Sequence, residues 1–278
     1  MRAFRVAYDG AGYHGFQRQP DVPTVEDALL GALRDLDVLG DDADTPPGYA
    51  AAGRTDAGVS ALAQTVAFEA PDWLTPAAFN GELPADVRAW ASADAPAAFH
   101  ATHDAASRTY RYHLHAPETG ASGGDGDTAG IDDERVRAAL DRLRGEHDFH
   151  NLTPDETGTV RDLSVSVARD GDFLVCEFTA GGFARQLVRR LVTLVAEVGR
   201  GEREPGAVER VLAPEPLPGS EGVGPAPPHP LLLADVAYPN LTFAVDADAA
   251  ASARAVFTER RVEHRTRARV AGDLLDGL

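Results

Sequence analysis

The chain has 278 residues, 44% of them hydrophobic, which is enough for a globular core and excludes wholesale disorder. It has 44 acidic residues against 26 basic ones, a net charge of -18, and every basic residue is arginine. Taken alone, this charge argues against a nucleic acid as the partner, while a large acidic excess is how halophiles keep proteins dissolved in strong salt. We therefore expect the protein to work in the cytoplasm of a halophile. Net charge does not describe a single site, so local clusters of arginine could still hold an anionic ligand.

Membrane insertion, secretion and metal binding are not indicated. The sequence shows no apolar leader and no apolar run long enough to cross a bilayer. Its one cysteine, Cys176, cannot form an internal disulfide, which fits a reducing cytoplasm, and its strand-like neighbours favour a buried thiol. The nine histidines are scattered, and His100 and His103 lack the companion ligands of a metal site.

The first expected element is a strand over residues 2–8, followed by a glycine-rich loop over 9–20. If exposed, Tyr13, Phe16 and Gln17 of this loop could stack on RNA bases and hydrogen-bond to them. The alternative is a structured turn in which Tyr13 and Phe16 fold back into the core.

A helix, a strand and a short helix are expected in the rest of the first hundred residues. The helix covers residues 24–36, with Thr24 as its N-cap and an apolar stripe along one face. Residues 59–70 have the pattern of a strand or of a short buried segment, and residues 76–83 that of a short helix.

Residues 52–61, with the sequence AGRTDAGVSA, are the most distinctive stretch of the chain. Gly53 and Gly58 permit a positive φ or a close backbone approach, which indicates a tight, ligand-facing loop. Arg54 and Asp56 are two residues apart, so in an extended loop a cation would lie beside the carboxylate and keep it ionised. Such an aspartate is a candidate nucleophile or base. The alternative is an ordinary β-turn with Asp and Gly in their usual places.

The second half of the chain opens with a strand over residues 105–115, and a tyrosine placed as Tyr110 is on such a strand is usually a core residue. Residues 117–130 are rich in Gly, Ser and Asp, which predicts a flexible surface loop. The pattern further predicts a helix over 132–143 and two strands, 160–168 and 173–180, joined by a hairpin turn at 169–172.

A strongly apolar helix is expected over residues 183–198, with Phe183 and the leucines that follow it forming a buried stripe. Arg185 and Arg189 would share its polar edge at i, i+4 spacing. Arginines at such an edge are usually solvated, which is the alternative to a functional role.

The C-terminal part combines an irregular segment and an arginine-rich helix. Residues 214–230 are rich in proline and glycine and have no periodicity. Residues 247–275 form the final helix, whose arginines could contact phosphates or pair with nearby acids such as Glu259 and Glu263.

Residues 53–59, GRTDAGV, resemble the catalytic signature of the TruA-type tRNA pseudouridine synthases. Further segments resemble that family's patterns, in the family's order. They include the loop at 8–17, with Phe16 where the family has tryptophan, the segment at 99–112, and the helix at 183–199.

The resemblance implies an α+β fold of two similar halves, each a largely antiparallel sheet backed by helices, with a central active-site cleft. We place the halves at residues 1–104, with the Asp56 loop, and 105–278, with Tyr110 and Arg189.

By the same resemblance, Asp56 is the catalytic residue and Arg189 forms an ion pair with it. Tyr110 stacks on the target uracil and is implicated in the chemistry, and Arg54 occupies or braces the space that the flipped base leaves. The expected further RNA contacts are Tyr13, Phe16 and Gln17.

The family isomerises uridine to pseudouridine at positions 38, 39 and 40 of the tRNA anticodon arm, as a homodimer without metal or cofactor. Three alternatives stay open: a synthase for other RNA uridines, a tRNA-binding protein without chemistry, and a nucleoside or glycoside hydrolase. The hydrolase would need a second catalytic carboxylate, and none stands out in the sequence.

Overall fold

The computed structural model describes residues 1–117 and 130–278. Nearly all of the surface loop expected at 117–130 therefore lies outside the described residues. The chain forms two compact units, each assembled from separate stretches of sequence. The first unit contains residues 1–54, 61–104 and 239–278, and the second contains residues 55–60 and 105–238.

This division differs from a single boundary after residue 104 in two places. The C-terminal segment belongs to the first unit because β10 (Ala244–Val245) pairs with β4 (Val87–Asp94) and the last helix packs on the same strand. The Asp56 loop, residues 55–60, belongs to the second unit, where its contacts are described below.

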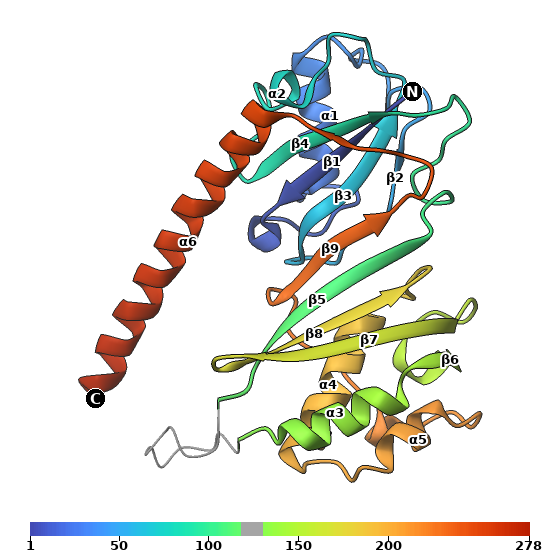
Figure 1. Cartoon of the computed structure of the whole chain (residues 1–278), viewed down its shortest axis with the longest axis vertical. Coiled ribbons are helices and arrows are strands. Elements are labelled where there is room, and N and C mark those ends of the chain that lie inside the picture. Colours follow the sequence, from blue (N-terminus) through green and yellow to red (C-terminus); the bar gives the residue numbers. More distant parts are fainter. Residues whose placement is uncertain (118–129) are drawn as a thin grey trace. The chain divides into compact units, whose positions relative to one another are not determined.

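The first unit is an antiparallel sheet with helices (Figure 1). Its strands run in the order β10-β4-β1-β3, and β2 pairs with β3. Three phenylalanines fill its core: the ring of Phe4 stacks on Phe68 at 5.3 Å and meets the edge of Phe79 at 5.6 Å between centroids. Its remaining elements are β1 (Arg2–Tyr8), α1 (Val25–Asp35), β2 (Ala50–Ala51), β3 (Ser60–Phe68), α2 (Pro76–Phe79), α6 (Ala247–Asp276) and the 3-10 turn Gly10–Gly12.

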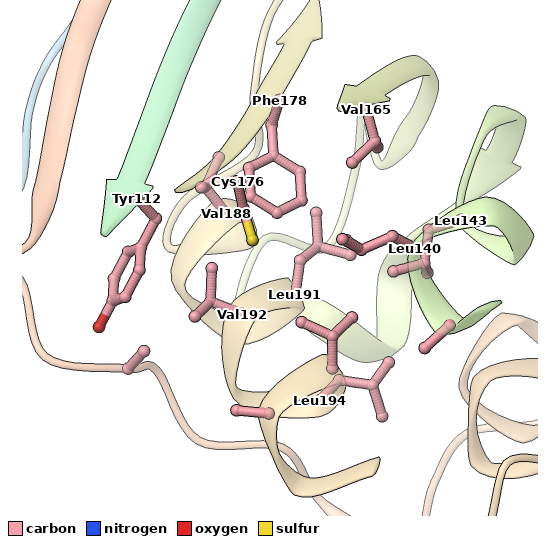
Figure 2. Close-up of a cluster of buried hydrophobic side chains, with 14 of the residues drawn as sticks. Tyr112, Leu140, Leu143, Val165, Cys176, Phe178, Val188, Leu191, Val192 and Leu194 are labelled. Atoms are coloured by element: carbon pink, nitrogen blue, oxygen red, sulfur yellow. The ribbon is translucent and has the colours of Figure 1, made fainter. Parts of the chain in front are cut away.

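The second unit is also an antiparallel sheet with helices, with the strand order β9-β5-β8-β7-β6. Figure 2 shows its core, where Val188, Leu191 and Leu194 of one helix pack with Phe178 and Cys176 of β8. Its elements are β5 (Ser107–His115), α3 (Asp133–Arg142), β6 (Gly145–Asp148), β7 (Val160–Asp170), β8 (Phe173–Ala180), α4 (Leu187–Arg200), α5 (Ala207–Leu212), β9 (Leu231–Ala237) and the 3-10 turns His150–Leu152 and Gly219–Glu221.

The fold is α+β, as expected, and most local predictions are confirmed. Thr24 caps α1 by accepting the N–H of Asp27 at 3.2 Å, while its own hydroxyl donates to the Asp27 carboxylate at 2.6 Å. β7 and β8 form the expected hairpin, whose two-residue turn begins at Gly171 with φ +55°. Cys176 is fully buried, and burial raises its pKa to about 12.

One helix begins later than expected. α4 starts at Leu187 instead of residue 183, because Gln186 adopts a left-handed φ of +60° and interrupts the helical backbone. Phe183 and Arg185 therefore precede the helix, and Arg185 does not share an edge of α4 with Arg189. Among the described residues, no helix is long and apolar enough to cross a membrane.

Candidate active site

Asp56 opens a tight turn, in which the N–H of Val59 donates to the Asp56 carbonyl at 3.1 Å. The turn needs glycine at its third position, because Gly58 has φ +77° and a Cβ there would lie 3.0 Å from Cγ of Pro228. The β-turn interpretation is thus correct, and it does not exclude a functional one. Gly53 differs, since its φ is not positive and a Cβ on it would meet nothing within 4 Å.

The carboxylate of Asp56 is paired with Arg189, from the first turn of α4. Nη1 of Arg189 donates to Oδ2 of Asp56 at 3.0 Å, and the side chains are 13% exposed for arginine and 30% for aspartate. The guanidinium of Arg189 is permanently charged and largely buried. Its bond to Asp56 occupies one carboxylate oxygen and leaves the other available. The ion pair that the family resemblance implied is confirmed, and the solvated alternative for Arg189 is excluded.

The segment around Ala226 holds Arg189 in place. Nε of Arg189 donates to the Ala226 carbonyl at 2.6 Å, and the Ala226 N–H donates to the Arg189 carbonyl at 3.1 Å. Arg190 donates to the Val223 carbonyl at 2.6 Å, and the Tyr112 hydroxyl to the Pro227 carbonyl at 3.2 Å. The proline- and glycine-rich segment 214–230, which has no periodicity in the sequence, therefore supports the candidate site. It does so through main-chain carbonyl groups, which no pattern of side chains could reveal.

Tyr110 lies on β5, where its half-buried ring meets Phe183 edge to face at 5.2 Å between centroids. Burial, and next the charge of Asp56, raise the pKa of Tyr110 to about 12, so the phenol is neutral at physiological pH. The residue packs against the core and is also near Asp56, so the two interpretations of Tyr110 are compatible.

Arg108, two residues before Tyr110, is a buried arginine that the sequence did not single out. Its guanidinium donates to the carbonyl of Gly181 at 2.5 Å, and burial lowers its pKa. It thereby joins β5 to the glycine pair that precedes Phe183. The signal that could have found it is its place in the segment at 99–112 that resembles the family's pattern, two residues before Tyr110.

Arg185 does not contribute to the Asp56 ion pair. Its Nε lies 3.4 Å from Oδ1 of Asp155, and its backbone N–H donates to the other oxygen of the same carboxylate at 2.8 Å. Arg185 and Asp155 form a second, more exposed arginine–aspartate pair in the second unit, which offers a natural control for experiments on the first.

The remaining candidates belong to the first unit. Tyr13 is half-buried and its hydroxyl donates to Asp86 at 2.8 Å, while Gln17 and Arg54 are exposed. Phe16 is only 1% exposed and packs near Tyr8, so it cannot offer a face to an RNA base as expected. The core alternative holds for Phe16, whereas the RNA contacts assigned to Tyr13, Gln17 and Arg54 stay predictions.

Comparison with known proteins identifies the family. Residues 139–239, which include Arg189, match the family model described as tRNA pseudouridine synthase. A Haloarcula marismortui protein named tRNA pseudouridine synthase A is 60% identical over 278 residues, which is 100% of each chain. The chain belongs to the tRNA pseudouridine synthase family.

Other members of the tRNA pseudouridine synthase family bear the same name. The Natronomonas pharaonis protein is 61% identical over 99% of this chain and 98% of its own, and the Methanosarcina acetivorans protein is 37% identical over 98% of each. The high identity to proteins of halophilic archaea agrees with the acidic, lysine-free composition. A solved archaeal box H/ACA sRNP Nop10-Cbf5 complex gives a TM-score of 0.33 at 14% identity over 69% of this chain and 45% of that one, too weak a likeness to assign function.

Proposed function

We propose that this chain converts uridine to pseudouridine in the anticodon arm of tRNA, at positions 38 to 40, with Asp56 as the catalytic carboxylate. The observation that carries the proposal is the Asp56–Arg189 ion pair, formed by the family's two signature positions. A protein that only bound tRNA would have no need to hold an aspartate in this way.

The reaction is an isomerisation, so it requires no oxidant, reductant or second substrate. The bond from N1 of uracil to C1′ of ribose breaks, and a bond from C5 to C1′ forms. C5 loses its proton and N1 gains one. Inside a stacked helix the reacting atoms of the uracil are out of reach of the enzyme, so the target base must first be extruded.

Asp56 acts either as a nucleophile at C1′ or as the base that removes a ribose proton. Both roles need a carboxylate with one accessible oxygen, which the pair with Arg189 leaves available. Tyr110 packs on the face of the flipped uracil, as a neutral phenol. Arg54 braces the space that the base leaves, and Tyr13 and Gln17 contact the RNA.

The enzyme works in the cytoplasm as a homodimer that binds one tRNA across both subunits. The buried, unpaired thiol of Cys176 supports a reducing compartment, and family membership supports the tRNA substrate. Sedimentation of the enzyme with and without tRNA, in molar KCl, tests the homodimer.

The first experiment is tritium release from tRNA that carries the label at C5 of uridine, in molar KCl. We expect release by the wild type and by Asp155→Asn, and none by Asp56→Asn, since only Asp56 reaches the reacting sugar. Release by Asp56→Asn would remove that residue from the mechanism. Bound tRNA with no release by the wild type would favour a protein without chemistry, and mapping the product uridines decides between positions 38 to 40 and others.

A further inference from the structure

The C-terminal helix α6 is long, and only its beginning is packed. It covers 30 residues, about 45 Å at about 1.5 Å per residue. Its buried positions are Ala249, Ala250 and Ala253, near its beginning, and the helix contacts β4. From Arg261 onward nearly every residue is exposed, and Figure 1 shows the helix continuing past β4 and α2. Most of α6 therefore contributes nothing to the core of the first unit.

Beyond its packed beginning, α6 reverses the charge of the chain. Residues 254–269 contain six arginines and two acidic residues, in a protein whose net charge is -18. Two of the arginines, Arg260 and Arg267, pair with Glu263 at 3.3 and 2.7 Å. Pairing within the helix thus accounts for these two arginines and leaves four.

The other four arginines form a row, which we call the arginine row: Arg254, Arg261, Arg265 and Arg269. At 3.6 residues per turn they lie within about 80° of one another and span about 22 Å along the axis. All four are exposed, and none forms an ion pair among the residues that the structure describes. Arg260, Glu263 and Arg267 occupy a different face of the helix.

The arginine row does not stabilise the helix. Like charges at i, i+4, as in Arg261–Arg265 and Arg265–Arg269, destabilise a helix. None of the four lies in the last turn, where a cation would favour the helix dipole. A row of unpaired cations on an unsupported helix is instead suited to a polyanion.

We propose that the arginine row binds the phosphate backbone of the tRNA substrate. This inference rests on the proposed function for the identity of the polyanion. Arginine suits the task in strong brine, where counterion release fades, because its planar guanidinium also forms paired hydrogen bonds to phosphate. The contacts are to the backbone and carry no base specificity.

Equilibrium binding of unmodified tRNA to the full chain, over a KCl series, tests the proposal. The row variant Arg261→Gln/Arg265→Gln is compared with Arg260→Gln/Arg267→Gln, which removes the same charge from the same helix. Glutamine has nearly the helix propensity of arginine, and circular dichroism checks that α6 remains formed.

We expect the row variant to bind more weakly at every salt concentration, with a slope of log K against log salt shallower by about 1 for each arginine removed. The paired-face variant should match the wild type, and Arg261→Lys/Arg265→Lys should retain the slope. Equal losses in both glutamine variants, or no loss in the row variant, would overturn the proposal. So would a row variant that changes only self-association, measured by sedimentation, since the row would then bind a second copy of this acidic chain.

The rate of pseudouridine formation at saturating tRNA is expected to stay within about twofold of wild type in the row variant, because backbone contacts act on binding and not on the chemical step. Since the binding assay needs no turnover, its outcome is separate from that of the tritium assay. A wild type that binds tRNA through the arginine row yet releases no tritium would refute only the proposed function.

Discussion

Arg189 and Ala226 are joined by two hydrogen bonds that run in opposite directions. The Ala226 N–H donates to the Arg189 carbonyl at 3.1 Å, and Nε of Arg189 donates to the Ala226 carbonyl at 2.6 Å. The second bond fixes the plane of the guanidinium, so that Nη1 points to Asp56 at 3.0 Å. The carboxylate is therefore oriented before substrate arrives, and no reorganisation is needed during the reaction.

Arg189→Lys is expected to lower the rate of pseudouridine formation by on the order of 100-fold, because an ammonium lacks the rigid, planar set of donors with which the guanidinium contacts Ala226 and Asp56 together, and the carboxylate loses its orientation. Single-turnover kinetics with tRNA measure the effect. Arg185→Lys, which alters the pair with Asp155, should leave the rate near wild type. Similar rates for the two variants would contradict the assignment.

Gly58→Ala is expected to lower the free energy of unfolding by roughly 1–2 kcal/mol, the cost of a left-handed backbone for an L-residue. Activity should fall as well, because the new Cβ presses on Pro228 and displaces the Asp56 turn. Denaturant titration and tritium release measure the two effects. Gly53→Ala should keep the wild-type stability, because a Cβ at that position meets nothing within 4 Å. An equal loss of stability in Gly53→Ala would show that the backbone conformation of Gly58 is not the cause.

Tyr110→Phe is expected to keep the KM for tRNA near wild type, because the phenylalanine ring retains the edge-to-face contact with Phe183 and the face that packs on uracil. Tyr110→Ala, which removes both, should raise KM. Steady-state kinetics with both variants provide the measurement. A large rise of KM in Tyr110→Phe would refute the stacking role, and a fall of kcat alone would show that the hydroxyl takes part in the chemistry.

Alkaline pH is expected to destabilise the second unit through Tyr110, Tyr112 and Cys176. Burial is the main reason that the pKa of each group is raised to about 12, from ordinary values of 10.0 for tyrosine and 9.0 for the thiol. The folded chain keeps protons that the unfolded chain releases, so this stability is complete below pH 9 and is lost as the pH rises from 9 to 12. The loss is at most about 1.4 kcal/mol per pH unit for each group.

Denaturant titrations across this range check the expectation. In the unfolded chain the thiol, with an ordinary pKa of 9.0, releases its proton at lower pH than the tyrosines, so Cys176→Ala should flatten the curve most at the lower end of this range. An unchanged slope in that variant would show that Cys176 is not the group responsible.

Local sequence patterns predicted most of the elements, because their causes are local. Thr24 caps its helix through its own side chain, and Gly171 sets the β7–β8 turn through its own backbone. The predicted start of α4 at residue 183 was wrong, and for a different reason. Gln186 has no residue-level reason to adopt a positive φ, and the apolar spacing of Phe183 with Leu187 continues across it.

The candidate site was predictable only in part. The Asp56–Arg189 pair joins residues 133 positions apart and was expected from the family resemblance alone, since spacing could not have shown it. The support from Ala226 could not be foreseen, because it acts through main-chain atoms that every residue has. Phe16 was misassigned because an aromatic residue in a glycine-rich loop has the same pattern whether it is exposed or buried.

The interleaving of the two units constrains how the protein is made. The last forty residues complete the first unit, and β10 covers the edge of β4 that faces away from β1. A ribosome must therefore synthesise β10 and the packed beginning of α6 before the part made first is complete. A chain released early at residue 238 would carry an intact Asp56 and Arg189, yet present the bare edge of β4, an open template for aggregation. Premature termination should thus yield a substrate for proteolysis instead of a smaller enzyme.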